Sequence, residues 1–355
     1  MLAWVPMNAA EKLRRIARKR VSKAQHLLVD AIRPHIPDGL HADDWLIPEE
    51  MTLAYYTPAW AELRENERLA LNHWVYALLY TRISDGEEYV LQANAAIAEH
   101  VRSHEPEVAA LFLLENREEV DHIAAFRMVR DQVMRNLGLA RLRFPRKRGR
   151  GLFVNGPAVR TLLKTFGADY VVTYFLARGI ANHMGKGYEV GVAGMHNRNA
   201  EVQRLSLLHS QDESHHMAIS RLMSAGAREL LPPVRGGRVY RRMRRAMQRT
   251  VAYYTFAASF YQGYDRQMSE LALGAMPTFR GRSRDFVHEL LDAHFATECG
   301  IERSRNKFMG RPNRQLLEGA ALLPEDKELW YRTLVEHQGN LRFFDRDPSF
   351  LAVAG

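Results

Sequence analysis

The sequence has little cysteine and no long apolar run. Cys299 is the only cysteine among 355 residues, which excludes an intramolecular disulfide framework and suits a reducing, cytoplasmic environment. Metal sites built from cysteine are excluded with it, so any metal must be held by His, Asp and Glu. No stretch approaches about 18 consecutive apolar residues, so no transmembrane helix is expected. The opening stretch MLAWVPMNAAEKLRRIARKR carries its charges after its apolar patch, the wrong order for a secretory signal.

Signals for β-strands are also lacking. Long stretches are rich in Ala, Leu, Glu, Arg and Met, with few Gly or Pro, and their apolar residues follow a helical period. No linker is long enough to separate two domains. We therefore predict an all-α protein, with a basic helix and an irregular connection over 1–50 and a single helical domain over 51–345. Helices are expected near 8–34, 59–102, 105–138, 157–195, 199–226, 240–274, 282–307 and 324–338.

The net charge of +9 comes largely from two arginine-rich segments, RLRFPRKRGRG (141–151) and RGGRVYRRMRRAMQR (235–249). They suit an acidic partner, such as a carrier protein or an electron-transfer protein. Solvated connections beside helices are the commoner origin of such runs. No nucleic-acid-binding motif accompanies them, so no nucleic-acid partner is expected.

An internal repeat carries the most chemical information. Residues 107–122 read EVAALFLLENREEVDH and residues 201–216 read EVQRLSLLHSQDESHH. Aligned without gaps, both contain Glu-x-x-His, as Glu119/His122 and as Glu213/His216. One copy is weak, because Glu and His three apart are common on solvated helices. Two copies on long helices with corresponding apolar faces are much harder to explain as chance spacing on solvated helices.

The spacing has a physical meaning. Residues three or four apart lie on one helix face, so a Glu and a His can bind one ion together while the carboxylate bridges to a second. Four-helix bundles that bind two irons or manganeses use two such helices and a Glu from each of the other two. His209 lies on the same stripe as Glu213 and His216, while Asp212 and His215 are expected to point away from it. An acid centred on an apolar stripe is unfavourable unless it is paired or bound to metal.

The remaining helices should supply further ligands. Upstream, Glu87 sits within an apolar stripe, thirty-two residues before Glu119, as an antiparallel pair with a short turn requires. Glu88 is the fallback and looks solvated. In the second half the symmetric position falls near residue 182, where no Glu is present. We predict His183 as the ligand there, with a core histidine as the alternative. Glu189 is the nearest acid, two turns on, and is assigned to a different stripe.

The sequence resembles the p-aminobenzoate N-oxygenase family in its run of His209, Glu213 and His216, combined with the upstream Glu119-x-x-His122 and an earlier Glu. The members of this family are ferritin-like non-haem di-iron oxygenases that convert arylamines to nitro compounds. The resemblance covers roughly residues 70–225, and the histidine at 209 separates it from ferritins and acyl-carrier-protein desaturases. It implies a ferritin-like helical bundle with additional flanking helices and a site for two Fe ions, with Mn left open. By position, Glu119 and Glu213 would bridge the ions, and the terminal ligands would be Glu87, His122, His209 and His216. The departure is the third helix, where Asn182 and His183 replace the expected Glu.

The resemblance implies an O2-activating monooxygenase that acts on the nitrogen of an arylamine or amino-acid-derived amine. Such an enzyme takes electrons from an external donor such as a ferredoxin or reductase. One alternative keeps the di-iron centre but oxidises carbon, as a hydroxylase, desaturase or halogenase acting on a carrier-tethered substrate. Another alternative is a metal-free ferritin-like partner protein. An iron-storage function has less support from the sequence than these alternatives. Oligomeric state stays open, with a homodimer among the expectations, and no membrane partner is expected.

Other conspicuous residues are assigned to structure. A set of aromatic residues is compatible with a substrate pocket, but helical spacing of this kind more often marks a core. Arg178 is compatible with a substrate carboxylate, although a surface role is the stronger expectation. His294 and Glu298 lie one turn apart without a matching repeat, so we interpret them as structural or supporting. The aromatic set is Phe112, Phe126, Tyr170, Tyr174 and Phe175.

Overall fold

In the computed structural model all regular structure of the described residues is helical and no strand occurs among them, which confirms an all-α helical bundle. None of the helices formed by the described residues is long and apolar enough to cross a membrane. The described residues are 8–22, 30–31, 33, 40–143, 156–194, 199–231, 234, 236–256, 262–295 and 314–336.

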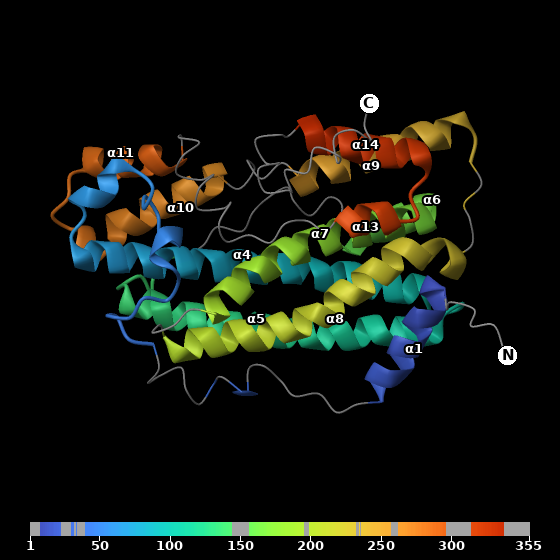
Figure 1. Ribbon diagram of the computed structural model, residues 1–355, viewed down its shortest axis with the longest axis horizontal. Helices are drawn as coiled ribbons and strands as arrows, with labels where there is room; N and C mark the ends of the chain where they lie inside the picture. Colours follow the sequence, from blue (N-terminus) through green and yellow to red (C-terminus); the bar gives the residue numbers. More distant parts are fainter. Residues whose placement is uncertain are drawn as a thin grey trace.

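Four long helices form the centre of the molecule (Figure 1). They are α4 (Glu65–Val101), α5 (Pro106–Asn136), α7 (Ala168–Ala193) and α8 (Ala200–Leu230). The most extensive contacts in the bundle are those of α4 with α5 and of α7 with α8. Each pair contains one helix with a Glu-x-x-His motif, as the internal repeat predicts.

Local sequence explains where these helices begin and end. Pro106 starts α5, where its missing N–H costs nothing. Asn199 caps α8, its side-chain oxygen accepting the Val202 N–H at 3.1 Å. The single helix predicted over 157–195 is wrong, because Gly167 separates α6 (Gly156–Phe166) from α7. Gly167 has φ +50° and ψ −124°, a conformation that glycine adopts without the steric penalty of a Cβ atom.

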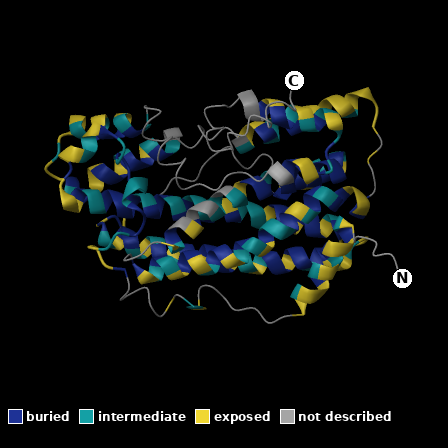
Figure 2. Cartoon of the chain, in the orientation of Figure 1, coloured by how far each residue is buried: buried dark blue, intermediate teal, exposed yellow. Residues whose placement is uncertain are grey.

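Shorter helices flank the bundle, and Figure 2 shows that their exposed residues gather on the outward faces. Of the helix predicted over 8–34, the structure describes Ala9–Val21 as helical, and 23–29, 32 and 34 lie outside the described residues. Parts of the helices predicted over 240–274 and 282–307 also lie outside them, namely 257–261 and 296–307. The flanking elements are α1 (Ala9–Val21), η1 (Glu49–Met51), η2 (Pro58–Glu62), α9 (Arg238–Phe256), α10 (Gln262–Ala275), η5 (Pro277–Phe279), α11 (Arg284–Phe295), α13 (Arg314–Gly319) and α14 (Pro324–Glu336).

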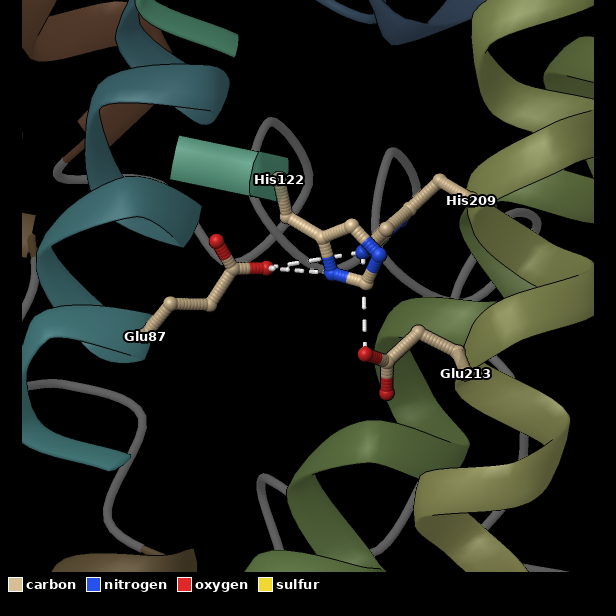
Figure 3. Close-up of side chains that lie close together, drawn as sticks. All are labelled: Glu87, His122, His209 and Glu213. Carbon is tan, nitrogen blue, oxygen red and sulfur yellow. Dashed lines mark ion pairs between the residues drawn. The ribbon is translucent and has the colours of Figure 1, made fainter. Parts of the chain in front are cut away.

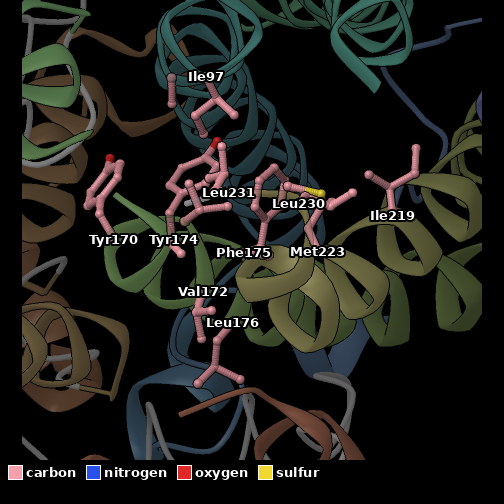
Figure 4. Packing of buried hydrophobic residues seen from close by; sticks show 14 of the residues in the cluster. Ile97, Tyr170, Val172, Tyr174, Phe175, Leu176, Ile219, Met223, Leu230 and Leu231 are labelled. Carbon is pink, nitrogen blue, oxygen red and sulfur yellow. The ribbon is translucent and has the colours of Figure 1, made fainter. Parts of the chain in front are cut away.

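The core is divided into two apolar clusters along the bundle. The first takes residues 93–101 of α4, 108–114 of α5 and 219–230 of α8, and includes the packing drawn in Figure 4. The second takes residues 70–80 of α4, 125–134 of α5 and 202–205 of α8. The stretch of each helix between the two clusters carries buried polar side chains. A polar layer therefore crosses the middle of the bundle, with apolar side chains on both sides.

Candidate metal centre

The polar layer contains two overlapping groups of potential metal ligands. All their members are buried, and within each group one polar atom per residue lies within 4.8 Å of all the others. The side chains come from α4, α5 and α8, and Figure 3 shows those of the first group converging. Six of the seven predicted ligands are thus brought together. The first group is Glu87, His122, His209 and Glu213, and the second is Glu119, His122, Glu213 and His216.

The polar atoms of the first group lie close to the spacing of atoms that share an ion. Metal–ligand distances of about 2.1 Å place neighbouring ligand atoms roughly 3.0–3.4 Å apart. The Nε2 atom of His209 lies 3.4 Å from Glu87 Oε1 and 3.6 Å from Glu213 Oε1. The Nδ1 atom of His122 lies 3.9 Å from the same Glu87 oxygen. All three distances are long for hydrogen bonds. The first lies at the upper end of the range for ligands of one ion, and the other two exceed that range by 0.2 and 0.5 Å.

The second group is similar but tighter on one side. Glu119 places Oε2 3.4 Å from His122 Nδ1 and Oε1 3.3 Å from His216 Nδ1. His216 Nδ1 also lies within hydrogen-bond distance of Glu213 Oε1, at 2.7 Å. Glu213 and His122 belong to both groups. A carboxylate shared between two groups is the arrangement required for a bridging ligand; the bridging role of Glu119 stays a prediction.

Buried polar atoms without hydrogen-bond partners also indicate that the site suits a bound ion. The inward nitrogens His122 Nδ1 and His209 Nε2 and the oxygens Glu87 Oε2 and Glu119 Oε2 are buried without a hydrogen-bond partner. Such groups are costly in a protein interior unless water or an ion satisfies them. The chemistry of these donors, imidazole nitrogen and carboxylate oxygen, fits a first-row transition metal.

Each histidine turns its other ring nitrogen toward an outer carboxylate. His209 Nδ1 lies 2.5 Å from Glu189 Oε2, and His216 Nε2 lies 3.1 Å from Glu118 Oε2. His122 Nε2 lies 3.4 Å from Asp212 Oδ2. A carboxylate on the far nitrogen of a metal-bound histidine fixes which nitrogen faces the metal.

These outer carboxylates were missed from the sequence. Asp212 was expected to point away from the site, yet it reaches His122 on the neighbouring helix α5. Glu118 and Asp212 directly precede the candidate ligands Glu119 and Glu213 in the sequence, and this adjacency was the available signal. Glu189 was placed on a different stripe, although it reaches His209.

The third helix contributes support in place of a carboxylate ligand. At the position where a Glu was expected, Asn182 donates an N–H to Glu213 Oε2 at 2.8 Å. His183, predicted as the seventh ligand, belongs to neither potential metal group.

Arg178 is buried beside the second group, so the expected surface role is wrong. Its exposed fraction is 5 %, and its Nη2 atom lies 2.9 Å from one oxygen each of Glu115 and Glu119. Asn94 donates a further N–H to Glu115 at 3.1 Å. Burial lowers the pKa of Arg178, but the two carboxylates outweigh burial and raise it. A fixed positive charge therefore balances carboxylates at this edge of the site.

Burial and neighbouring charges shift the pKa values of several groups in the site. Burial raises the pKa of Glu87 to about 7. Burial lowers the pKa of His122, but the neighbouring carboxylates of Asp212 and Glu119 outweigh burial and raise the pKa to about 9. The pKa values of His209 and His216 are also raised despite burial, by Glu189 and by Glu119 respectively. Without a metal, these histidines hold the protons that a cation would displace.

The predicted aromatic set belongs to the core. All five side chains are buried, and Phe112 stacks on Phe175 with ring centroids 5.4 Å apart. Phe126 also covers the site, with its ring centroid 4.6 Å from that of His209 and 6.3 Å from that of His122. This ring limits water access to the first group.

The remaining predicted residues lie elsewhere. Glu88 is half-exposed and forms an ion pair with Arg127, which supports Glu87 over Glu88 as the residue in the site. His294 accepts the Ala54 N–H at 3.2 Å, a structural contact, and Glu298 lies outside the described residues.

One face of α9 presents much of the second arginine-rich segment to solvent. Four exposed arginines line a hollow of about 230 Å³, and within the described residues none of them forms an ion pair. Residues 144–151 of the first segment lie outside the described residues. The four arginines, here called the α9 arginine face, are Arg238, Arg241, Arg242 and Arg245.

Comparison with known proteins adds no relative: no family model matches the chain, and no curated protein or solved structure matches it.

Proposed function

We propose that this chain is an O2-activating di-iron monooxygenase that oxidises the nitrogen of an amine. The observation that carries the proposal is the pair of overlapping buried ligand groups sharing Glu213 and His122. One ion would be held by Glu87, His209 and Glu213, and the other by Glu119, His216 and Glu213. The single inward nitrogen of His122 would bind one of the two ions. Two bound irons would supply the redox chemistry of O2 that no side chain provides.

The chain's own residues have defined tasks in this proposal. The outer carboxylates hold the far nitrogens of the histidines, so that the near nitrogens present lone pairs to the metals. Asn182 donates a hydrogen bond to Glu213, and Arg178 donates one to Glu119. The two apolar clusters exclude water from the polar layer, which strengthens every electrostatic interaction within it.

The reaction class rests on the resemblance rather than on the geometry. A histidine four residues before Glu-x-x-His, here His209, is the feature shared with arylamine N-oxygenases, and His209 reaches the ligand group. Conversion of an amine R–NH2 to R–NHOH with O2 consumes two electrons and two protons and releases water. The chain has a single cysteine, too few for an iron–sulfur cluster held by four cysteines. An external donor such as a ferredoxin or reductase is therefore part of the proposal.

The test has two stages. Purified chain, loaded anaerobically with Fe(II), should bind two irons, and the diferrous protein should change its optical spectrum on mixing with O2. Given a reductant and a panel of arylamines, it should then yield hydroxylamine, nitroso or nitro products by mass spectrometry. Glu119→Ala should lose iron and products, whereas the surface variant Glu88→Ala should keep both.

The outcomes separate the alternatives. Far fewer than two irons, with no effect of Glu119→Ala, would leave a metal-free partner protein as the better description. Two irons without any nitrogen-oxidised product would reject N-oxygenation while keeping the metal centre.

The α9 arginine face favours a second candidate, oxidation of carbon on a substrate tethered to an acidic carrier protein. Exposed arginines attract carboxylates and phosphates. Under this alternative, only a carrier-bound substrate is hydroxylated, desaturated or halogenated. Arg241→Glu with Arg242→Glu should raise the KM for that substrate at least tenfold, while iron content stays unchanged. Equal turnover of free and carrier-bound substrate would reject it.

A further inference from the structure

Glu189 differs from the other two outer carboxylates. Asp212 is partly exposed, with 36 % of its side chain accessible, and Glu118 pairs with Arg20 from α1. The Glu189 side chain is only 2 % exposed, and its Oε2 atom lies 2.5 Å from His209 Nδ1. Its second oxygen, Oε1, is buried without a hydrogen-bond partner. Its hydrogen-bonding capacity is therefore directed at His209.

The position of Glu189 on α7 explains what replaces the missing third-helix ligand. Asn182 and Glu189 are seven residues apart, which is two helical turns and nearly the same face. Asn182 bonds to Glu213 and Glu189 to His209. Through these two contacts α7 holds two of the ligands on α8 without entering either ligand group.

Charge balance gives this contact a consequence beyond orientation. The inner carboxylates Glu87, Glu119 and Glu213 bring three negative charges, whereas two divalent ions bring four positive ones. Arg178 and Glu115 are adjacent and offset one another. A positive charge left in an apolar interior is unfavourable, and the Glu189 carboxylate is the buried acid next to the histidine that can offset it.

We infer that Glu189 is the positioning residue of His209 and supplies from α7 the fourth negative charge of the metal centre. The inference rests on the proposed di-metal site. It requires that Glu189 act through the imidazole, holding Nδ1–H so that Nε2 faces the ion. Loss of such an outer partner typically weakens metal affinity about 10–100-fold.

Two substitutions separate orientation from charge. Glu189→Gln keeps an oxygen that accepts the Nδ1–H but removes the charge, and Glu189→Leu removes both. We expect the dissociation constant of the weaker Fe(II), measured anaerobically by chelator competition, to rise about tenfold in the Gln variant and up to about 100-fold in the Leu variant. The midpoint potential of the iron centre should rise in both variants, because a negative charge is lost. The matched control Glu88→Gln, on the outer surface beside a ligand, should change neither quantity.

A spectroscopic readout distinguishes positioning from simple loss of packing. In protein loaded with diamagnetic Zn(II), the short bond to Glu189 should give the His209 Nδ1–H a downfield proton resonance. This resonance should persist, shifted, in the Gln variant and vanish in the Leu variant. If the Leu variant fails to fold, the Gln variant with its potential and resonance decides the question.

Three results would overturn the inference. One is unchanged affinity and potential in Glu189→Gln when the wild type binds two ions. Another is loss of one whole ion in that variant, which would make Glu189 a ligand. The third is a His209 resonance indifferent to Glu189→Leu. A wild type that binds no metal would instead reject the proposed function, so the two failures are distinguishable.

Discussion

Replacement of Arg178 by Met should destabilise the protein by an amount that depends on metal. The guanidinium is buried and lies 2.9 Å from both Glu115 and Glu119. Removing one partner of a buried ion pair typically costs about 3–5 kcal/mol, because a charge is left uncompensated. We expect that cost in the metal-free protein.

Metal should reduce the cost. When Glu119 is bound to a metal it no longer depends on Arg178, so only the contact with Glu115 is lost. One hydrogen bond to a charged group contributes about 1.5–3 kcal/mol, and the cost of Arg178→Met should fall by that amount. The assay is urea denaturation with chelator and, anaerobically, with saturating Mn(II).

Arg244 provides the matched control. It is buried to a similar degree, with 4 % of its side chain exposed, and pairs with Glu325 and Asp326 away from the site. Arg244→Met should cost the same with and without metal. If the cost of Arg178→Met is likewise independent of metal, Glu119 does not contact a bound ion and the reasoning fails.

Three further predictions test other parts of the structure. Phe126→Ala should cost about 3–5 kcal/mol in unfolding free energy while leaving the metal count unchanged; a lost ion would mean that Phe126 shapes the ligands. Gly226→Ala should cost about 1–3 kcal/mol by calorimetry or urea titration, because its Cβ would lie 3.0 Å from Ala9 Cβ and 3.1 Å from the Ala10 nitrogen; no change would mean that α1 is not seated on α8. The pKa of His122 is raised from 6.5 to about 9, so its charged form stabilises the metal-free protein below pH 6.5, and this stabilisation is lost as the pH rises through 9. His122→Gln should remove this pH dependence of the unfolding free energy. A variant whose unfolding free energy follows the same pH profile as the wild type would contradict the prediction.

Much of the fold was accessible from the sequence because helical periodicity is strong in the long segments. The break between α6 and α7 was missed, since one glycine in a helical pattern is often tolerated. Gly167 ends the helix because its backbone adopts a positive φ, which periodicity does not register.

The convergence of the candidate ligands was predictable because the internal repeat ties chemistry to helical spacing. Glu119/His122 and Glu213/His216 lie on matching faces, and Glu87 was separable from Glu88 by its place on an apolar stripe. His183 was chosen by symmetry between the two halves, and the pairing of α7 with α8 places Asn182 against Glu213 instead.

The contacts of the residues that support the candidate ligands could not be predicted from the periodicity of a single helix. Arg178 meets carboxylates on α5 and Asp212 meets a histidine on α5, so both contacts depend on how helices pack against one another. Glu118 illustrates the same limit, because its partners, Arg20 on α1 and His216 on α8, are far away in sequence.

Anomalous diffraction at the iron edge, from crystals grown anaerobically with Fe(II), tests the metal centre most directly. We predict two peaks roughly 3.5–4 Å apart, one beside Glu87 and His209 and the other beside Glu119 and His216, with Glu213 between them. A single peak, no peak in the polar layer, or peaks held by other residues would contradict the di-metal centre.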